Sequence, residues 1–220
     1  MAGGPVGARA LIFDFNGTLS HDEPILAEIF VELFAAHGRP LSVQEYFDEL
    51  AGLSDPEIVR TWLGREHPAV EEVIRERVER YRAAVADGSS VPPHVREAVR
   101  YAAERVPVAV VSGAARAEIE PVLEAAGLAD ALSLVVSADD VLHGKPDPEG
   151  YVRALERLDA GIPTEDVLVF EDTEAGIAAA KAAGMRCFAV LGTLAPTRLS
   201  AADEVIERLD VAVVARVLAT

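Results

Sequence analysis

The chain has 220 residues, and 20 Lys and Arg against 37 Asp and Glu give a formal charge of 20 − 37 = −17. This charge argues against a nucleic-acid binder or a basic membrane-surface module, because both need cations that face phosphate groups. Half of the residues are hydrophobic, enough for a sizeable core, and no apolar run approaches the length of a membrane span. Cys187 is the only cysteine, which excludes an intrachain disulfide and a cysteine metal cluster. With no signal peptide expected at residues 1–9, these facts indicate a soluble cytoplasmic protein.

The first predicted element is a buried strand over residues 10–15, which ends in the polar turn Asn16-Gly17-Thr18. A continuous apolar run of this length is typical of a parallel strand that is buried on both faces. Between residues 23 and 85 the pattern changes, because apolar residues then recur at helical spacing. Besides a first helix around residues 25–34, this segment contains helical patterns over 43–50, 56–63 and 69–84. It is predicted to be a helical insert, and its charged stretch 71–82 is predicted to be a solvated face.

A stretch rich in Gly, Ser and Pro over residues 88–93 resembles a linker, and beyond it helices and strands alternate. The predicted strands are 106–111, 134–137, 167–170 and 187–191. The predicted helices are 94–104, 117–126, 148–158 and 175–183, and segments 202–209 and 211–218 finish the chain. This alternation implies right-handed crossovers and a parallel sheet. We therefore expect an α/β fold, with a Rossmann-like parallel sheet flanked by helices over residues 1–20 and 91–220 and an inserted helical domain over 21–90.

Carboxylates stand at the ends of two predicted strands. Asp14 lies near the end of the first predicted strand, and Glu171 and Asp172 follow the strand over 167–170. Adjacent carboxylates repel each other, and a bound cation would offset that repulsion. Oxygen ligands from Asp14 and Asp172 suit Mg²⁺, with water and a substrate phosphate completing its shell. The alternative is a turn or helix-capping role for the aspartates, which would leave Glu171 unexplained.

Two further strand ends carry groups that suit a phosphate. Ser112 and Gly113 precede a predicted helix, where a hydroxyl and free amides would cradle an anion, although a plain serine cap is the simpler reading of this motif alone. Lys145 lies between Gly144 and Pro146 in a rigid loop, which suits a fixed charge against an anion, with a solvated lysine as the alternative. Because parallel strands bind ligands at their carboxyl ends, the four motifs together favour one active site.

In combination these motifs resemble those of the haloacid dehalogenase superfamily of phosphohydrolases, over nearly the whole chain. The segment 14–19 (Asp-Phe-Asn-Gly-Thr-Leu) resembles the first motif, Asp-x-Asp-Gly-Thr, while Ser112 and Lys145 match the second and third motifs. The segment 171–185 resembles the fourth motif, in the form typical of the branch that contains β-phosphoglucomutase and many sugar-phosphate phosphatases. The helical insert corresponds to the α-helical cap of that branch.

The resemblance implies a role for each matching residue. Asp14 would be the nucleophile, and Mg²⁺ would be held by Asp14, Asp172 and the backbone carbonyl of Asn16, with support from Glu171. The phosphoryl oxygens would be bound by Ser112, Gly113, Thr18 and Lys145. The implied function is hydrolysis of a small phosphorylated metabolite through an aspartyl-phosphate intermediate, by a monomer or homodimer with no nucleic-acid or membrane partner.

Asn16 departs from the family pattern, which has an aspartate there as the acid and base. An amide can donate a hydrogen bond but carries no titrating proton, and such proton transfer is typically worth about 10²–10⁴-fold in rate. The nearby candidates for a substitute are His21, Asp22, Glu23 and His143. For each of them a solvated hinge or loop position is the commoner role.

Two alternative functions stay open. Slow attack by water would favour a phosphomutase or phosphotransferase, and Asn16 also fits a catalytically weakened phosphate-binding protein. The metal-free dehalogenase reaction is disfavoured by Glu171 and Asp172, and Schiff-base chemistry by a cap lysine is excluded because no lysine lies between Leu19 and Pro92. The segment 50–55 resembles the cap loop that faces the core in this branch, and Arg60 beyond it is either a substrate contact or a solvated residue.

Overall fold

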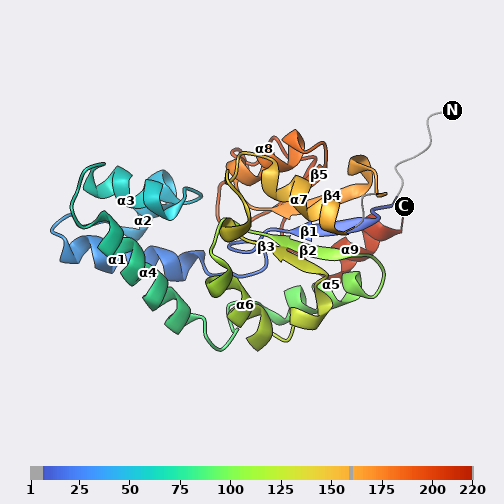
Figure 1. The fold of residues 1–220 in the computed structure, drawn as a ribbon, viewed down its shortest axis with the longest axis horizontal. Coiled ribbons are helices and arrows are strands. Elements are labelled where there is room, and N and C mark those ends of the chain that lie inside the picture. The colour runs from blue at the N-terminus through green and yellow to red at the C-terminus, as the bar shows by residue number, and fades with distance from the viewer. Residues whose placement is uncertain (1–6, 159–160, 220) are drawn as a thin grey trace.

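The computed structural model describes residues 7–158 and 161–219. Its core is one six-stranded sheet in the order β3-β2-β1-β4-β5-β6, with every neighbouring pair parallel (Figure 1). The strands are β1 (Ala10–Phe13), β2 (Val108–Val111), β3 (Leu134–Val136), β4 (Val167–Glu171), β5 (Arg186–Val190) and β6 (Glu204–Ile206). The predicted Rossmann-like parallel sheet is thus confirmed. The first six residues, part of the stretch where we expect no signal peptide, lie outside the described residues.

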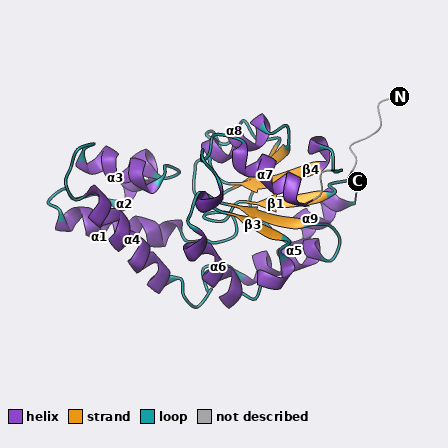
Figure 2. Ribbon diagram, in the orientation of Figure 1, coloured by secondary structure: helices purple, strands orange, loops and turns teal. Residues whose placement is uncertain are grey.

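Helices cover both faces of the sheet (Figure 2). Two of them, α7 (Glu149–Leu158) and α8 (Glu174–Ala182), lie on one face. The other face carries α5 (Pro93–Ala103), α6 (Arg116–Ala125) and α9 (Val211–Leu218). Short 3₁₀ turns stand at Ala129–Ala131, Ala138–Asp140 and Thr164–Asp166. Every residue of β1, β2 and β4 is buried, as expected of strands covered on both sides.

A lobe of helices separates β1 from α5 in the chain and lies beside the sheet (Figure 1). We call it the helical lobe. It contains α1 (Glu23–Ala36), α2 (Val43–Glu45), α3 (Asp55–Leu63) and α4 (Val70–Ala84). The predicted helix over 43–50 is α2 followed by a π-helical turn over Tyr46–Leu50. Ser42 and Ser54 precede α2 and α3, and the amide of each donates to the carboxylate of the glutamate three residues later, at 2.8 and 3.0 Å. At Ser42 the Glu45 amide also donates to the serine hydroxyl, which completes a capping box.

Strands β1 and β2 are each two residues shorter than predicted. β1 ends at Phe13, because the chain turns directly after Asp14 and the Phe15 carbonyl accepts from the amides of Leu19 and Ser20. β2 begins only at Val108, because the Val106 amide still bonds back to α5 and the following proline has no N–H to donate. Asp14 therefore stands just beyond the strand end, in the turn.

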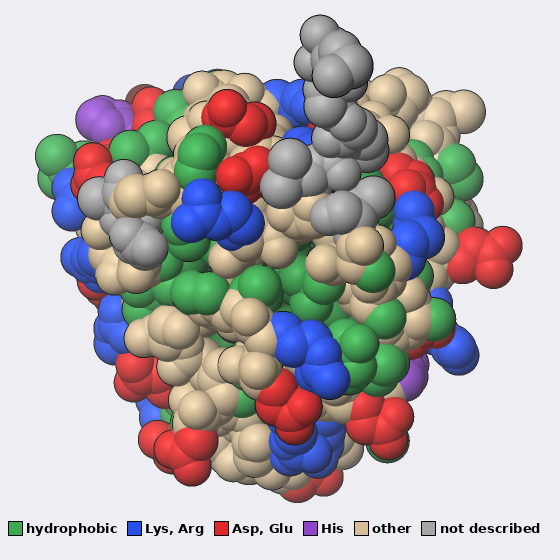
Figure 3. All heavy atoms as spheres, turned by 90° about the vertical axis from the view of Figure 1, so that its right-hand side faces the viewer, with side chains coloured by type: hydrophobic (Ala, Val, Ile, Leu, Met, Phe, Trp, Pro, Cys, Tyr) green, Lys and Arg blue, Asp and Glu red, His purple; other side chains and the backbone are tan. Residues whose placement is uncertain are grey.

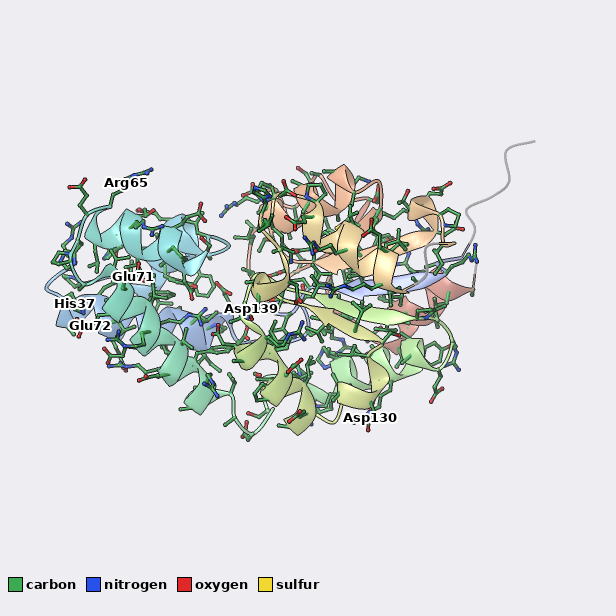
Figure 4. The ribbon with its side chains drawn as sticks, viewed as in Figure 1. His37, Arg65, Glu71, Glu72, Asp130 and Asp139 are labelled. Atoms are coloured by element: carbon green, nitrogen blue, oxygen red, sulfur yellow. The ribbon has the colours of Figure 1, made fainter. Side chains whose placement is uncertain are left out.

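One outer face of the molecule carries side chains of both charges. Figure 3 shows the face at the right of Figure 1, where acidic and basic side chains lie side by side among apolar groups. On the helical lobe, Glu71 and Glu72 lie at the end of α4 that is remote from the sheet (Figure 4). Among the residues described here, no helix combines the length and the apolar character needed to cross a membrane.

Candidate active site

Four charged side chains meet at the carboxyl ends of the central strands, on the side of the sheet that faces the helical lobe (Figure 1). Asp14 follows β1, Glu171 ends β4, and Asp172 comes next, while Lys145 lies in the loop between β3 and α7. We call these four residues the strand-end cluster. The structure thus brings together residues that are up to 158 positions apart in the chain, since Asp14 and Asp172 belong to the same group of carboxylates.

The ammonium group of Lys145 is held by three hydrogen bonds. Its Nζ donates to Asp14 Oδ1 at 2.5 Å, to Glu171 Oε1 at 2.6 Å and to the Val111 carbonyl at 3.2 Å. Burial by itself would lower the pKa of Lys145, but the two carboxylates outweigh it and raise that pKa above its ordinary value. Lys145 is therefore a fixed cation at the strand ends, as its rigid loop predicts.

Glu171 is the anchor of the cluster. Its side chain is fully buried, and its Oε2 accepts from the amides of Asp172 at 2.9 Å and Thr173 at 3.0 Å. Burial would raise the pKa of Glu171, but Lys145 and these hydrogen bonds outweigh it and hold that pKa below its ordinary value. A Cβ on Gly176 would collide with this carboxylate, which explains the glycine in the first turn of α8.

Asp172 has an unsatisfied oxygen. The residue is 1% exposed, its Oδ1 accepts from the Thr18 hydroxyl at 3.2 Å, and its Oδ2 is buried without a hydrogen-bond partner. Burial raises the pKa of Asp172 well above its ordinary value, and the nearby Asp14 and Glu171 raise it further. Burial likewise raises the pKa of Asp14 to about 7, although Lys145 opposes the shift. Burial thus disfavours the charged forms of Asp14 and Asp172, and a nearby cation would favour them.

These carboxyl groups fit a divalent metal ion. One oxygen of each of Asp14, Glu171 and Asp172 lies within 4.8 Å of the others. Mg²⁺ prefers hard oxygen donors, and a buried carboxylate oxygen with no hydrogen-bond partner is available to it. A Cβ on Gly17 would collide with Asp172 Oδ2, so the turn after β1 keeps this space open only with glycine.

The residues predicted to bind the phosphate differ in their burial and in their hydrogen-bond partners. Ser112 follows β2 and is buried, and its Oγ accepts from the Ala114 amide at 3.1 Å, while Gly113 is exposed. The Ala115 amide donates to Glu118, so two of the amides expected to be free have partners within the protein. Thr18 is fully buried and its hydroxyl points to Asp172. Substrate contacts for these residues stay predictions.

Asn16 lies between the strand-end cluster and the helical lobe. Its Nδ2 donates to Asp22 Oδ2 at 2.9 Å and to the Tyr81 hydroxyl oxygen at 3.2 Å. On the other side, the Ser112 hydroxyl donates to Asn16 Oδ1 at 3.5 Å, a weak contact. The Asn16 amide is therefore engaged by groups from three separate parts of the chain.

Asp22 alone among the four candidate substitutes is hydrogen-bonded to Asn16 in the described structure. The ring of His21 lies 5.8 Å from that of His94, and the Glu23 carboxylate accepts from the Tyr46 hydroxyl at 2.9 Å. His143 is exposed and pairs with Glu149 at 3.3 Å. Burial raises the pKa of Asp22, which its hydrogen bonds partly offset.

Sequence reasoning missed a second charged group, between the helical lobe and the core. Arg77 of α4 binds Glu118 of α6 and also Asp55 of α3, at 2.8 Å from its Nη2. Glu23, 9% exposed, belongs to the same region: burial raises its pKa, and among its charged neighbours Arg77 opposes that shift while Asp55 adds to it. We call Glu23, Asp55, Arg77 and Glu118 the lobe–core cluster. Arg77 is only 6% exposed, so the prediction that 71–82 is a solvated face is wrong at this position.

The error has a simple cause. Arg80 and Glu76 of the same helix form a partly exposed ion pair with an N–O distance of 2.6 Å, as helical spacing predicts. Alternating charges cannot show which of them will face another part of the chain. The loop over 50–55 also lies against the core, because a Cβ on Gly52 would stand 3.5 Å from Thr173 Cγ2. Arg60 is exposed on α3, and its contact with substrate stays a prediction.

Comparisons with known proteins agree with this architecture. The sequence matches the family model of haloacid dehalogenase-like hydrolases over residues 8–184. It is 31% identical to a validoxylamine A 7′-phosphate phosphatase from Streptomyces hygroscopicus subsp. limoneus, over 91% of this chain and 94% of that protein. It is 32% identical to a phosphoglycolate phosphatase from Pectobacterium atrosepticum, over 81% and 78%.

A solved structure shares the whole fold. The crystal structure of a CbbY mutant from Rhodobacter sphaeroides in complex with xylulose-(1,5)bisphosphate superposes with a TM-score of 0.80 at 27% identity. The match covers 92% of this chain and 95% of that one. The similarity thus extends over most of both chains and is not confined to the sheet.

Proposed function

The chain belongs to the haloacid dehalogenase-like hydrolases, and we propose that it is an Mg²⁺-dependent phosphatase of small phosphate monoesters. The observation that carries the proposal is the strand-end cluster, in which Asp14 is bonded to Lys145 beside an unpartnered oxygen of Asp172. The phosphatase relatives support the reaction class. Their named substrates share a phosphate group but differ in the rest of the molecule, so they support no single substrate here.

In the proposed reaction Asp14 is the nucleophile. One of its carboxylate oxygens bonds to phosphorus while the bond from phosphorus to the alcohol oxygen breaks, and Lys145 neutralises charge on the phosphoryl oxygens. Mg²⁺, held by Asp14, Asp172 and the Asn16 carbonyl, would supply further neutralisation of that charge. Glu171 holds Lys145 in place. The Ser112 hydroxyl and Gly113 would bind the same phosphoryl group, and Thr18 would orient Asp172.

The second half of the reaction releases phosphate. The oxygen of a water molecule bonds to phosphorus as the bond to Asp14 breaks, which regenerates the carboxylate. Asn16 cannot give a titrating proton to the leaving alcohol or take one from that water, so both protons are exchanged with bulk water. We therefore expect turnover to be about 10²–10⁴-fold slower than in a site whose surroundings accommodate a carboxyl group at this position. Transfer to a second hydroxyl, as in a phosphomutase, is the alternative that Asn16 favours.

The test is phosphate release from a panel of phosphorylated sugars and short acids, with and without Mg²⁺. We expect release from at least one of them, and Asp14→Ala should lower its rate by about 10⁴-fold or more because the nucleophile is gone. Asp130→Asn, at an exposed position remote from the strand ends, is the matched control (Figure 4). An unchanged rate in Asp14→Ala would refute the proposal. Isomerised product from a hexose 1-phosphate would indicate the mutase instead.

We also propose that residues 21–90 act as a cap over a core domain of residues 1–20 and 91–220. The helical lobe falls within that range, and its loop over 50–55 lies against Thr173 beside Asp172. The cytoplasmic location and the monomeric or homodimeric state stay predictions from the sequence.

A further inference from the structure

The side chain of Asn16 is held by two buried residues. Asp22 is fully buried and Tyr81, in α4 of the helical lobe, is 1% exposed. The Tyr81 hydroxyl donates to Asp22 Oδ2 at 2.5 Å, and the Asn16 Nδ2 donates to that same oxygen at 2.9 Å. The Gly17 amide donates to the Ser20 carbonyl at 2.7 Å and also points to the second oxygen, Asp22 Oδ1, at 3.3 Å.

These contacts determine which way round the amide of Asn16 stands. A carboxylate only accepts hydrogen bonds, so the group that faces Asp22 must be the NH₂ of Asn16 and not its carbonyl. Tyr81 has one hydroxyl hydrogen, which it gives to Asp22, and its oxygen is then an acceptor for the second hydrogen of Nδ2. The Asn16 Oδ1 is left on the opposite side, where Ser112 lies.

We propose that Asp22 and Tyr81 are positioning residues that turn the carbonyl oxygen of Asn16, rather than its NH₂ group, toward the phosphoryl site. This inference rests on the proposed function, because the site is the one assigned to phosphoryl transfer. In this orientation Asn16 accepts a hydrogen bond from a water molecule or a hydroxyl group at the site and has no N–H left to give. Asn16 would thereby orient the water molecule or hydroxyl group that accepts the phosphoryl group.

The pairing also makes residues 16 and 22 interdependent. An amide and a carboxylate are complementary at 2.9 Å, whereas two carboxylates at that distance repel each other. If residue 22 were also an amide, its NH₂ group would have to face another donor, either Asn16 Nδ2 or the Gly17 amide. An aspartate at position 16 is therefore compatible with the surroundings only when position 22 loses its charge.

A double-mutant cycle tests this interdependence. We expect Asn16→Asp and Asp22→Asn to lower kcat about ten- to hundredfold each, as unpaired buried polar groups do. The double variant Asn16→Asp/Asp22→Asn should restore kcat to at least the wild-type level, because an amide and a carboxylate again face each other. Losses that simply multiply, or a gain of kcat in Asn16→Asp alone, would overturn the proposal.

A second measurement does not depend on turnover. In ¹⁵N-labelled protein the Asn16 side-chain NH₂ signals, identified by their loss in Asn16→Asp, should exchange slowly because both hydrogens are bonded to buried acceptors. Tyr81→Phe and Asp22→Asn should shift these signals and speed their exchange, whereas Tyr101→Phe and Asp130→Asn should not. Unchanged Asn16 signals in both site variants would overturn the proposal. A wild-type protein that releases no phosphate would defeat the proposed function, while these signals would still decide on the orientation.

Discussion

Two largely buried groups of charged side chains in this protein have the same balance of charges but differ in how those charges are paired. The strand-end cluster contains Asp14, Glu171, Asp172 and Lys145, and the lobe–core cluster contains Glu23, Asp55, Glu118 and Arg77. Each has three carboxyl groups and one cation. In the lobe–core cluster Arg77 bonds to two of the carboxylates, and Tyr46 donates to the third. In the strand-end cluster Lys145 also bonds to two, but Asp172 Oδ2 has no partner.

The geometry of the two cations explains the difference. The planar guanidinium of Arg77 reaches from one helix to two others and ties the lobe to the core. The single ammonium of Lys145 uses its donors on Asp14, Glu171 and a backbone carbonyl, so none is left for Asp172. A cluster in which every carboxyl group has a hydrogen-bond partner stabilises the fold. A cluster in which one carboxylate oxygen has no partner is suited to bind a cation from solution.

The largest effect on stability should come from breaking the lobe–core cluster. Arg77→Met should lower the free energy of unfolding by about 3–5 kcal/mol, because it leaves the buried Glu118 and the partly buried Asp55 carboxyl groups without their cation. Urea unfolding of both proteins measures the difference.

The matched control for this variant lies one turn further along the same helix. Arg80 is 37% exposed at its side chain and pairs with Glu32 and Glu76, so Arg80→Met should cost only about 0–1 kcal/mol. Equal losses of unfolding free energy in the two variants would show that the buried pairing of Arg77 stabilises the fold no more than the exposed pairing of Arg80.

The next effect is a dependence of stability on pH that originates at Glu23. Burial raises the pKa of Glu23 to about 7 from its ordinary 4.5, against the opposing hydrogen bond from Tyr46. The folded state thus binds a proton that the unfolded state has released, so this stabilisation is present below pH 4.5 and is lost as pH rises through about 7. Its size is about 3 kcal/mol at most.

Glu23→Gln isolates this contribution. Asp14, whose pKa is also raised to about 7 by burial, changes stability in the same direction and stays in both proteins. Unfolding free energies measured between pH 4.5 and 8 should therefore fall more steeply in the wild type than in Glu23→Gln. Parallel curves for the two proteins would show that Glu23 is ionised at neutral pH after all.

A smaller effect should separate the two clusters by their response to metal. At a Mg²⁺ concentration 100 times Kd, the wild-type protein should gain about 2.7 kcal/mol of stability. Asp172→Asn should lose most of that gain, because the unpartnered carboxylate oxygen is removed. Arg77→Met should keep the gain. A metal response that survives Asp172→Asn would place the cation elsewhere.

Much of the fold is readable from local patterns. Continuous apolar runs predict strands such as 167–170, and the alternation with helices predicts a parallel sheet, which the structure confirms. The polar residues directly after those runs, such as Asp14 and Asp172, were therefore expected at one edge, and the structure brings them together. The strand limits at Phe13 and Val108 were not predictable, because a turn and a helix end outside the runs set them.

The remainder depends on contacts between distant segments. Nothing in the sequence around Arg77 distinguishes it from Arg80, and only the packing of α4 against α6 buries one and leaves the other partly exposed. In the same way, the sequence shows an asparagine at position 16 and an aspartate at position 22, but not that Tyr81 joins them from 59 residues further on.

By itself, the sequence determined the class of the fold and the chemistry available at the strand ends, because both follow from residue types at short spacing along the chain. The tertiary structure alone decided how those groups pair: that Lys145 leaves Asp172 unpartnered, that Arg77 joins the lobe to the core, and that Asn16 turns its carbonyl oxygen toward Ser112. Hydrogen bonds and ion pairs depend on ångström distances between side chains, and only the packing of the whole chain sets those distances.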